Sequence, residues 1–222
     1  MTDDVLARKV STSILETEST SEEVKKFVLD CHVWPFYGVA VDLINIDVAL
    51  EAVEGTGMKV MTVASYPLGG MYTSVKCGQI EYARSHGAHE MDACLNFFDF
   101  KSGRYDSVLR DIQMMKDACG DDLKLILIPQ FAVLTNDEKI RACELMLEAG
   151  VPHLKTNTGY GYNTLVDDVT FIKRRYGDDM SVEVSGGIRT RADAEMVVNA
   201  GACVVHTSTP LQVAGISPAK SS

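Results

Sequence analysis

The regular alternation of short apolar runs with longer amphipathic segments constrains the fold of this chain more than any other feature. Eight short runs, bounded by polar residues or glycine, have the length and composition of buried strands. They cover residues 9–15, 37–44, 58–65, 89–96, 123–129, 151–156, 180–186 and 202–208. Between them a helical period predicts helices over residues 20–32, 45–55, 74–87, 105–119, 136–150, 165–177 and 190–201.

Strands that alternate with helices in this way form parallel βα units. Eight units favour a closed (β/α)8 TIM barrel over an open doubly wound sheet. A GxGxxG or GxxxxGK[ST] motif after the first strand would favour the open sheet, and the sequence has neither. No linker interrupts the chain, so we expect residues 1–222 to form a single domain. Only "LQVAGISPAKSS" follows "HTSTP", so the last helix should be short or missing.

The charge and the cysteines restrict the class of partner and the compartment. A net charge of −10 argues against nucleic acid or an anionic membrane surface as partner, although a basic pocket could still hold a small anion. No apolar run approaches the ~20 residues that span a bilayer, and the N-terminus lacks the apolar core of a signal peptide. Six cysteines without a CxxC pair indicate reduced thiols and a cytoplasmic location. The five histidines lack metal-binding spacings, so we expect no metal.

A lysine ends a predicted buried strand in "VPHLKTNTGYGYN", where an unpaired ammonium would be costly. Because side chains alternate along strands, this Lys155 is expected to face the barrel interior together with Lys124, Asp92 and Glu183. One interpretation is a satisfied ion-pair network that fills a polar layer. The other is an active site at the carboxyl ends of the strands, where burial lowers the pKa of Lys155 and its neutral amine forms a Schiff base with a carbonyl.

The turn "SGGIRT" after the seventh strand places Gly186 and Gly187 at a strand-to-helix junction. Backbone amides at such a junction can bind an anion, and the loops after strands seven and eight commonly bind phosphate in barrels. "HTSTP" after the eighth strand adds hydroxyl groups, among them that of Ser208. Many turns need glycine for backbone reasons alone, so the position of this turn carries the argument.

Trp34, Phe36 and Tyr37 are expected to pack between the first helix and the second strand.

These segments resemble the deoxyribose-phosphate aldolase family. "LKTNTGYG" is similar to the family's Schiff-base segment KTSTGFG, "VEVSGGIRT" to KASGGIRT, and "GAHEMDACLN" to GADEIDMVIN. The resemblance covers nearly the whole chain and is strongest over residues 134–190. It implies a class I aldolase without cofactors, in which Lys155 carries the imine and Asp92 works with a water in proton transfer. Homodimers are common in that family, although nothing in this sequence marks an interface.

One departure from the family is central. The family has a second lysine, two residues before SGG, that lowers the pKa of the imine-forming lysine; this chain has Glu183 there. A carboxylate has the opposite effect and favours the protonated amine, since two unit charges ~4 Å apart interact by about 4 kcal/mol at an effective dielectric of ~20. Three interpretations remain open. Lys124 supplies the missing cation, Glu183 acts as a general base, or the imine chemistry is lost.

Other departures predict an altered substrate. Ser11 and Glu16 replace an aspartate and a lysine of the family's DHTLLKP segment. His206 stands where glycine is common, so that its imidazole narrows the phosphate pocket or offers a new donor. Gln130 lies in the segment after the fifth strand, where the family has an acidic side chain that this chain lacks. A related sugar phosphate or a non-phosphorylated aldehyde therefore fits better than deoxyribose 5-phosphate.

The leading hypothesis is a class I aldolase that makes or breaks a C–C bond between an aldehyde or ketone donor and an aldehyde acceptor. Its proposed catalytic residues are Lys155 for the imine, Asp92 and Glu183 for proton transfer, and Lys124 for charge tuning. The residues expected at a phosphate or other polar tail are Gly159, Gly186, Gly187, Ser208 and His206. The alternatives are an acid–base enzyme that uses Glu183 and Asp92 without an imine, and a non-catalytic sugar-phosphate-binding homologue.

Overall fold

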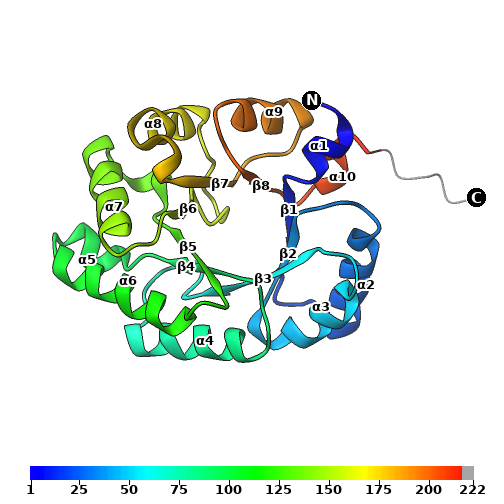
Figure 1. The fold of residues 1–222 in the computed structure, drawn as a ribbon, viewed down its shortest axis with the longest axis horizontal. Helices are drawn as coiled ribbons and strands as arrows, with labels where there is room; N and C mark the ends of the chain where they lie inside the picture. Colours follow the sequence, from blue (N-terminus) through cyan, green and yellow to red (C-terminus); the bar gives the residue numbers. More distant parts are fainter. Residues whose placement is uncertain (217–222) are drawn as a thin grey trace, which may run out of the picture.

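The computed structural model describes residues 1–216, and these form a closed barrel of eight parallel strands in the order β1 to β8 (Figure 1). The strands are β1 Val10–Ile14, β2 Gly38–Val41, β3 Lys59–Ala64, β4 Glu90–Cys94, β5 Lys124–Ile128, β6 His153–Lys155, β7 Ser181–Ser185 and β8 Val204–His206. β8 pairs with β1 and closes the ring. The predicted TIM barrel is confirmed, with every strand inside its predicted range.

Helices surround the barrel (Figure 1). They are α1 Asp3–Ala7, α2 Ser21–His32, α3 Ile46–Val53, α4 Thr73–Ser85, α5 Phe97–Lys101, α6 Tyr105–Cys119, α7 Asn136–Glu148, α8 Val166–Tyr176, α9 Arg191–Asn199 and α10 Pro210–Ala214, with the 3-10 helices η1 Leu43–Asn45, η2 Phe131–Val133 and η3 Gly177–Asp179. Among residues 1–216 no helix has the length and apolarity needed to cross a membrane.

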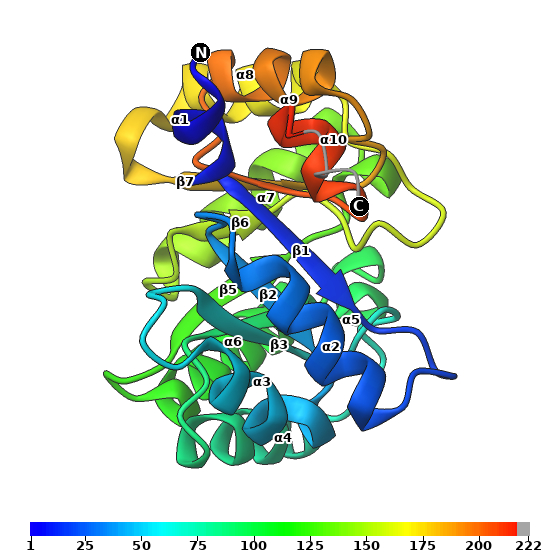
Figure 2. The same cartoon turned by 90° about the vertical axis from the view of Figure 1, so that its right-hand side faces the viewer.

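The sequence patterns missed some short elements. The helices α1 and α5 have five residues each, too few for a recognisable period. The second strand was predicted to reach Ile44, which is wrong: it ends at Val41, and Asp42 stands at the N-cap of η1. The helix after β8 is short, as expected, and lies beside α1 and β1 (Figure 2). The single-domain prediction extends to residue 222, beyond the described residues, and stays a prediction.

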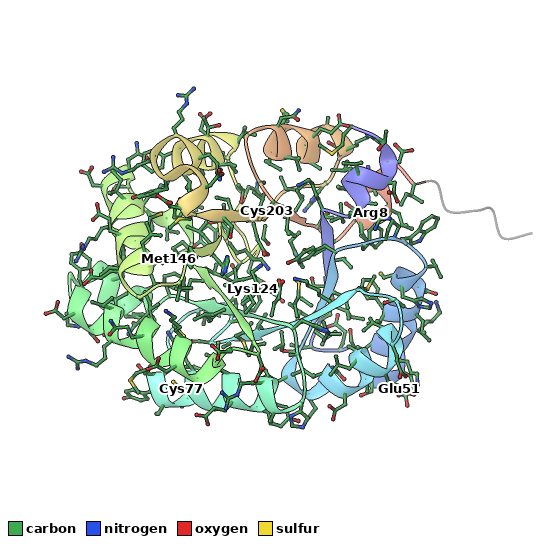
Figure 3. The ribbon with its side chains drawn as sticks, viewed as in Figure 1. Arg8, Glu51, Cys77, Lys124, Met146 and Cys203 are labelled. Atoms are coloured by element: carbon green, nitrogen blue, oxygen red, sulfur yellow. The ribbon has the colours of Figure 1, made fainter. Side chains whose placement is uncertain are left out.

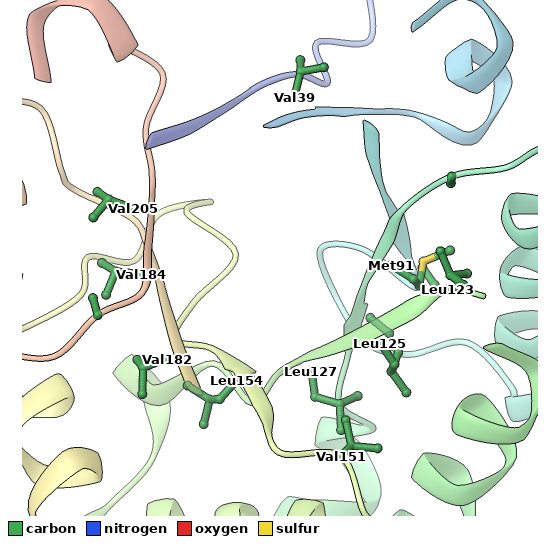
Figure 4. Packing of buried hydrophobic residues seen from close by; sticks show 14 of the residues in the cluster. Val39, Met91, Leu123, Leu125, Leu127, Val151, Leu154, Val182, Val184 and Val205 are labelled. Atoms are coloured by element: carbon green, nitrogen blue, oxygen red, sulfur yellow. The ribbon is translucent and has the colours of Figure 1, made fainter. Parts of the chain in front are cut away.

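Alternation along the strands separates an apolar outer layer from a partly charged interior. Outward side chains pack under the helices; Met91, Leu125, Leu127, Leu154 and Val182 belong to this core (Figure 4). Their neighbours along the strands face the barrel interior. The register places Lys155 beside Glu183 and Glu90 beside Lys124 on adjacent strands. Charged side chains from different strands therefore meet inside the barrel.

Helix N-termini are fixed by capping boxes on three sides of the barrel. Thr20, Thr135 and Thr190 accept hydrogen bonds from the backbone amides of Glu23, Glu138 and Asp193, whose carboxylates bond back to the threonine amides. Each box satisfies two amides that a helix end leaves without a partner.

A buried ion pair connects helices α4 and α6 outside the barrel. The ammonium of Lys76 on α4 is fully buried, 2.7 Å from Asp111 Oδ2 on α6, and donates to the carbonyl of Cys94 at 3.1 Å. Asp111 also accepts a hydrogen bond from Thr73. This pair fixes α4 and α6 to the end of β4.

Asp111→Ala should destabilise the protein by about 3–5 kcal/mol in urea unfolding, because it leaves the Lys76 ammonium buried without a counter-ion. The double variant Lys76→Met/Asp111→Leu should recover most of this loss. Asp30→Ala, which breaks an exposed pair with Lys26, is the matched control and should cost less than about 1 kcal/mol. Equal losses in Asp111→Ala and Asp30→Ala would contradict the role given to burial.

Candidate active site

The mouth of the barrel contains a cavity of about 370 Å³ at the carboxyl ends of the strands. Its walls come from the segments that follow β1, β3, β6, β7 and β8. All five residues expected at a polar tail line it, namely Gly159, Gly186, Gly187, Ser208 and His206. Active sites of TIM barrels lie at this end.

Lys155 and Asp92 lie at the floor of this mouth. Both line a small cavity of about 10 Å³ that shares Tyr66, Ser185 and His206 with the walls of the larger one. Only 3% of the surface of Lys155 is exposed. A space of this size holds about one water molecule, so a substrate carbonyl that reaches the amine displaces whatever occupies the floor.

The ammonium of Lys155 contacts two carboxylates. It donates a hydrogen bond to Asp92 Oδ2 on β4, two strands away, and its Nζ lies 3.5 Å from Glu183 Oε2 on the neighbouring strand. Burial pushes the pKa of Lys155 down, but Asp92 and Glu183 outweigh it and the pKa lies above its ordinary value. The lowering expected from burial is therefore outweighed, first by Asp92 and then by Glu183, and the second effect has the direction expected for a carboxylate at this position.

Asp92 responds in the complementary way. The pKa of its carboxyl is raised to about 6. Burial is the largest cause and the charge of Glu183 acts in the same direction, while the Lys155 ammonium lowers the pKa. Within residues 1–216 the Oδ1 atom of Asp92 has no hydrogen-bond partner. A carboxyl that titrates near neutrality beside an amine can pass protons to and from it.

Lys124 lies near the centre of the barrel (Figure 3). It is the first residue of β5, one layer deeper than Lys155, and contacts Glu183. Its Nζ is 3.2 Å from Glu183 Oε1 and 3.4 Å from Glu90 Oε1. Burial would lower the pKa of Lys124, but the two carboxylates raise it. The four residues predicted as catalytic therefore form one connected cluster inside the barrel, in which Glu183 links the two lysines.

Sequence reasoning missed one residue of the charged interior, Lys59, and misplaced another, Tyr37. Tyr37 does not pack between helix and strand as expected: its hydroxyl points into the barrel and donates to Glu90 Oε1. Lys59 Nζ lies 2.7 Å from the same oxygen. The signal was present, since Lys59, Glu90 and Lys124 are each the first residue of a strand and would share one layer.

The loop after β7 needs its glycines for two reasons. Gly186 and Gly187 have φ of 99° and 81°. A Cβ at Gly186 would come within 2.3 Å of the Tyr162 carbonyl, so the close approach of the loop after β6 also excludes a side chain. Among residues 1–216 the backbone amides of the two glycines donate no hydrogen bond, which leaves them available to an anion at the cavity wall.

Two charged side chains share this wall. Arg189 and Glu16 both line the cavity and carry opposite charges. The amides of Thr190 and Asp193 at the start of α9 are already paired with each other's side chains.

His206 is held by two serines of β1. Its Nδ1 lies 3.0 Å from Ser11 Oγ and its Nε2 lies 3.1 Å from Ser13 Oγ. Burial lowers the pKa of His206 to about 3, and the nearby Lys155 ammonium acts in the same direction. The imidazole is thus neutral and offers the cavity one ring face and fixed hydrogen bonds rather than a charge.

The loop after the lysine strand is anchored from both sides. Gln130 accepts a hydrogen bond from the amide of Thr158 at 2.8 Å, and the hydroxyl of Tyr66 donates to the Thr158 carbonyl. Asn157 Oδ1 accepts from the amide of Ala132 at 3.0 Å. The segment after β5 therefore positions the cavity wall beside Gly159.

Within residues 1–216 no cluster of histidine, cysteine or carboxylate side chains could hold a metal ion.

Comparison with known proteins gives a consistent set of relatives. No model of a protein family matches the chain. The deoxyribose-phosphate aldolase of Streptococcus suis strain 98HAH33 is 35% identical over 209 residues, covering 94% of each chain. That of Carboxydothermus hydrogenoformans is 34% identical over 212 residues, covering 94% of this chain and 93% of its own.

Solved structures agree with this. The aldolase QR15 has a TM-score of 0.89 and 28% identity, and the match covers 95% of this chain and 94% of its own. A deoxyribose phosphate aldolase from Aeropyrum pernix, described as tetrameric, has a TM-score of 0.87 at 23% identity, covering 96% of this chain and 91% of its own. The second likeness supports the fold alone.

The Asp92 carboxyl should titrate near pH 6 when followed by carbon-13 NMR. Lys155→Met should raise this pKa further because it removes the cation, and Glu183→Gln should lower it because it removes a like charge. Asp99, whose pKa is held below its ordinary value by Ser107 and Arg104, is the control and should not respond. An Asp92 signal that ignores both substitutions would contradict the coupling.

Proposed function

The chain belongs to the deoxyribose-phosphate aldolase family and is an aldehyde-lyase of the class I aldolase type, and on this premise we propose that Lys155 forms the imine. One observation carries this proposal. The amine of Lys155 lies at the floor of the mouth cavity, in contact with two carboxylates that can take its proton. A lysine so placed meets any carbonyl that enters the barrel.

In the proposed reaction the ammonium of Lys155 passes one proton to Asp92 or Glu183. The lone pair on Nζ then bonds to the carbonyl carbon, and the carbonyl π pair moves to oxygen. One proton then passes from nitrogen to that oxygen, the carboxyl group returns the proton it had taken, water leaves, and an iminium ion remains on Lys155. When the bond between the α and β carbons breaks, its electron pair moves toward this cation and forms an enamine, while the β-hydroxyl gives its proton to a base and becomes the carbonyl of the released aldehyde; bond formation is the reverse.

The proposed substrate is a small aldehyde or sugar with a phosphate or other polar tail. The tail would lie against Gly159, Gly186, Gly187, Ser208 and His206. The unpaired amides of the glycine turn support an anion there, and Arg189 adds a positive charge. Glu16 on the same wall opposes that charge, which supports a substrate other than deoxyribose 5-phosphate.

The proposal also covers the cellular location and the oligomeric state. Six free cysteines support a reducing, cytoplasmic location. A homodimer remains a proposal from the family resemblance; the tetramer of the Aeropyrum pernix protein belongs to that protein.

A second candidate is an acid–base enzyme that uses Asp92 and Glu183 without an imine. The raised pKa of Lys155 favours it, because a permanently charged lysine would act only as an electrostatic partner. Full activity in Lys155→Arg would support this candidate, since arginine keeps the charge but forms no imine.

Borohydride reduction in the presence of acetaldehyde should attach one ethyl group to Lys155, located by mass spectrometry of the digested protein. Trapping should increase as the pH rises, because the pKa of Lys155 lies above its ordinary value and more neutral amine forms at higher pH. Lys155→Arg should give no adduct.

Lys76→Arg is the control, because this buried lysine should not react and its replacement should leave the Lys155 adduct in place. Adducts spread over exposed lysines, with none at Lys155, would count against the imine.

Glu16→Lys should raise kcat/KM for deoxyribose 5-phosphate relative to unphosphorylated deoxyribose by about two- to fivefold. Reversing one exposed charge at the cavity wall changes an ionic interaction by up to about 1 kcal/mol. Acetaldehyde release measures both substrates. Glu18→Lys, an exposed residue that does not line the cavity, should leave the ratio unchanged. An unchanged ratio in Glu16→Lys would contradict the selectivity proposed for this wall.

A further inference from the structure

A layer of charged residues lies beneath the catalytic lysine, at the amino end of the barrel. Lys59, Glu90 and Lys124 begin β3, β4 and β5, and Tyr37 precedes β2. The other three residues all contact Oε1 of Glu90: the Tyr37 hydroxyl donates a hydrogen bond to it, Lys59 Nζ lies 2.7 Å away and Lys124 Nζ lies 3.4 Å away. Neither this layer nor its hydrogen bonds take part in binding a carbonyl at the mouth.

Glu183 connects this layer to the active site. Its Oε1 lies 3.2 Å from Lys124 Nζ and its Oε2 lies 3.5 Å from Lys155 Nζ. The side chain of Glu183 is fully buried, so its charge is little screened by water. Any charge added to or removed from the layer is therefore felt at Lys155 through one shared carboxylate.

Together with Glu183, the charges of the layer cancel. Glu90 and Glu183 contribute two negative charges, and Lys59 and Lys124 contribute two positive ones. With the layer neutral, Asp92 alone balances the ammonium of Lys155. The anion at position 183 is thus compensated two strands away, and the net charge beneath Lys155 is smaller than Glu183 alone would produce.

We propose that Tyr37, Lys59, Glu90 and Lys124 are positioning residues that, through Glu183, set how readily Lys155 loses its proton. The inference rests on the proposed imine chemistry of Lys155. Tyr37 and Lys59 hold Glu90, Glu90 holds Lys124 against Glu183, and Lys124 draws on the carboxylate that otherwise stabilises the Lys155 ammonium.

The groups that face this arrangement come from every adjoining strand. Asp92 on β4 and the neutral His206 on β8 lie beside Lys155, and the carboxylate of Asp92 raises the pKa of Lys155 directly. His153 on β6 bonds to Ser181 in the deeper layer, where burial lowers its pKa. The thiol of Cys203, which precedes β8, has a pKa raised by burial and by Glu183. Both groups are therefore neutral near pH 7, and the four charged residues dominate the layer.

The test is the pH at which borohydride trapping of acetaldehyde on Lys155 reaches half its maximum. Lys124→Met removes a cation and should move this midpoint up by about one pH unit. Glu90→Gln removes an anion and should move it down, while its amide oxygen still accepts from Tyr37. Shifts of opposite sign from two neighbouring residues are the signature of charge, since a loss of packing would move both in one direction.

Lys124→Arg keeps the charge and should leave the midpoint within about 0.3 pH units of wild type. Lys9→Met, at the same end of the barrel but outside the layer, is the matched control. Midpoints that all coincide, or that shift in the same direction, would overturn the proposal, as would a Lys124→Arg shift as large as that of Lys124→Met.

Carbon-13 titration of Asp92 provides a second measurement without substrate, on variants shown to be folded by circular dichroism. Lys124→Met should change the Asp92 titration, since Asp92 and Lys155 share a proton, and Lys124→Arg should not. An Asp92 titration that Lys124→Met leaves unaltered would overturn the proposal. If wild type forms no adduct at any pH, the imine itself fails. If an adduct forms but its pH midpoint is the same in wild type and in the Lys124 and Glu90 variants, the imine proposal stands and only the role proposed for the layer fails.

Discussion

The shared ammonium of Lys155 is the interaction on which the rest of the site depends. It lies inside a closed barrel, almost without water, between Asp92 and Glu183. Such a charge is stable only while both carboxylates face it, because an unpaired buried ion is costly. The same geometry makes the proton mobile, because burial disfavours the charged carboxylate and raises the pKa of Asp92 to about 6.

The replacement of a family lysine by Glu183 changes how this balance is reached. A cation beside the amine would favour its neutral form directly. Here the raised pKa of Lys155 favours the charged amine, and in the proposed reaction neutral amine forms through proton transfer to a neighbouring carboxylate. Lys124 and the layer around Glu90 limit the effect of the additional anion. The aldolase family membership and the altered charge are thus compatible within one barrel.

Much of this architecture follows from the sequence, because strand alternation and strand ends are local patterns. Lys155, Asp92, Glu183 and Lys124 could be placed in one interior from their positions in strands alone. Other features depend on tertiary contacts that no local pattern contains. The inward turn of Tyr37 depends on Glu90, two strands away, and His206 is fixed by two serines at the other end of the chain. The net direction of the Lys155 pKa required a balance between burial and two carboxylates, and only the geometry supplies it.

The most direct measurement of the central claim is a crystal structure of the protein reduced with borohydride in acetaldehyde. The account predicts continuous electron density from Lys155 Nζ to a two-carbon group on the mouth side, with Asp92 and Glu183 still beside the nitrogen. Density for an unmodified ammonium held between the two carboxylates, after exhaustive reduction at alkaline pH, would contradict it.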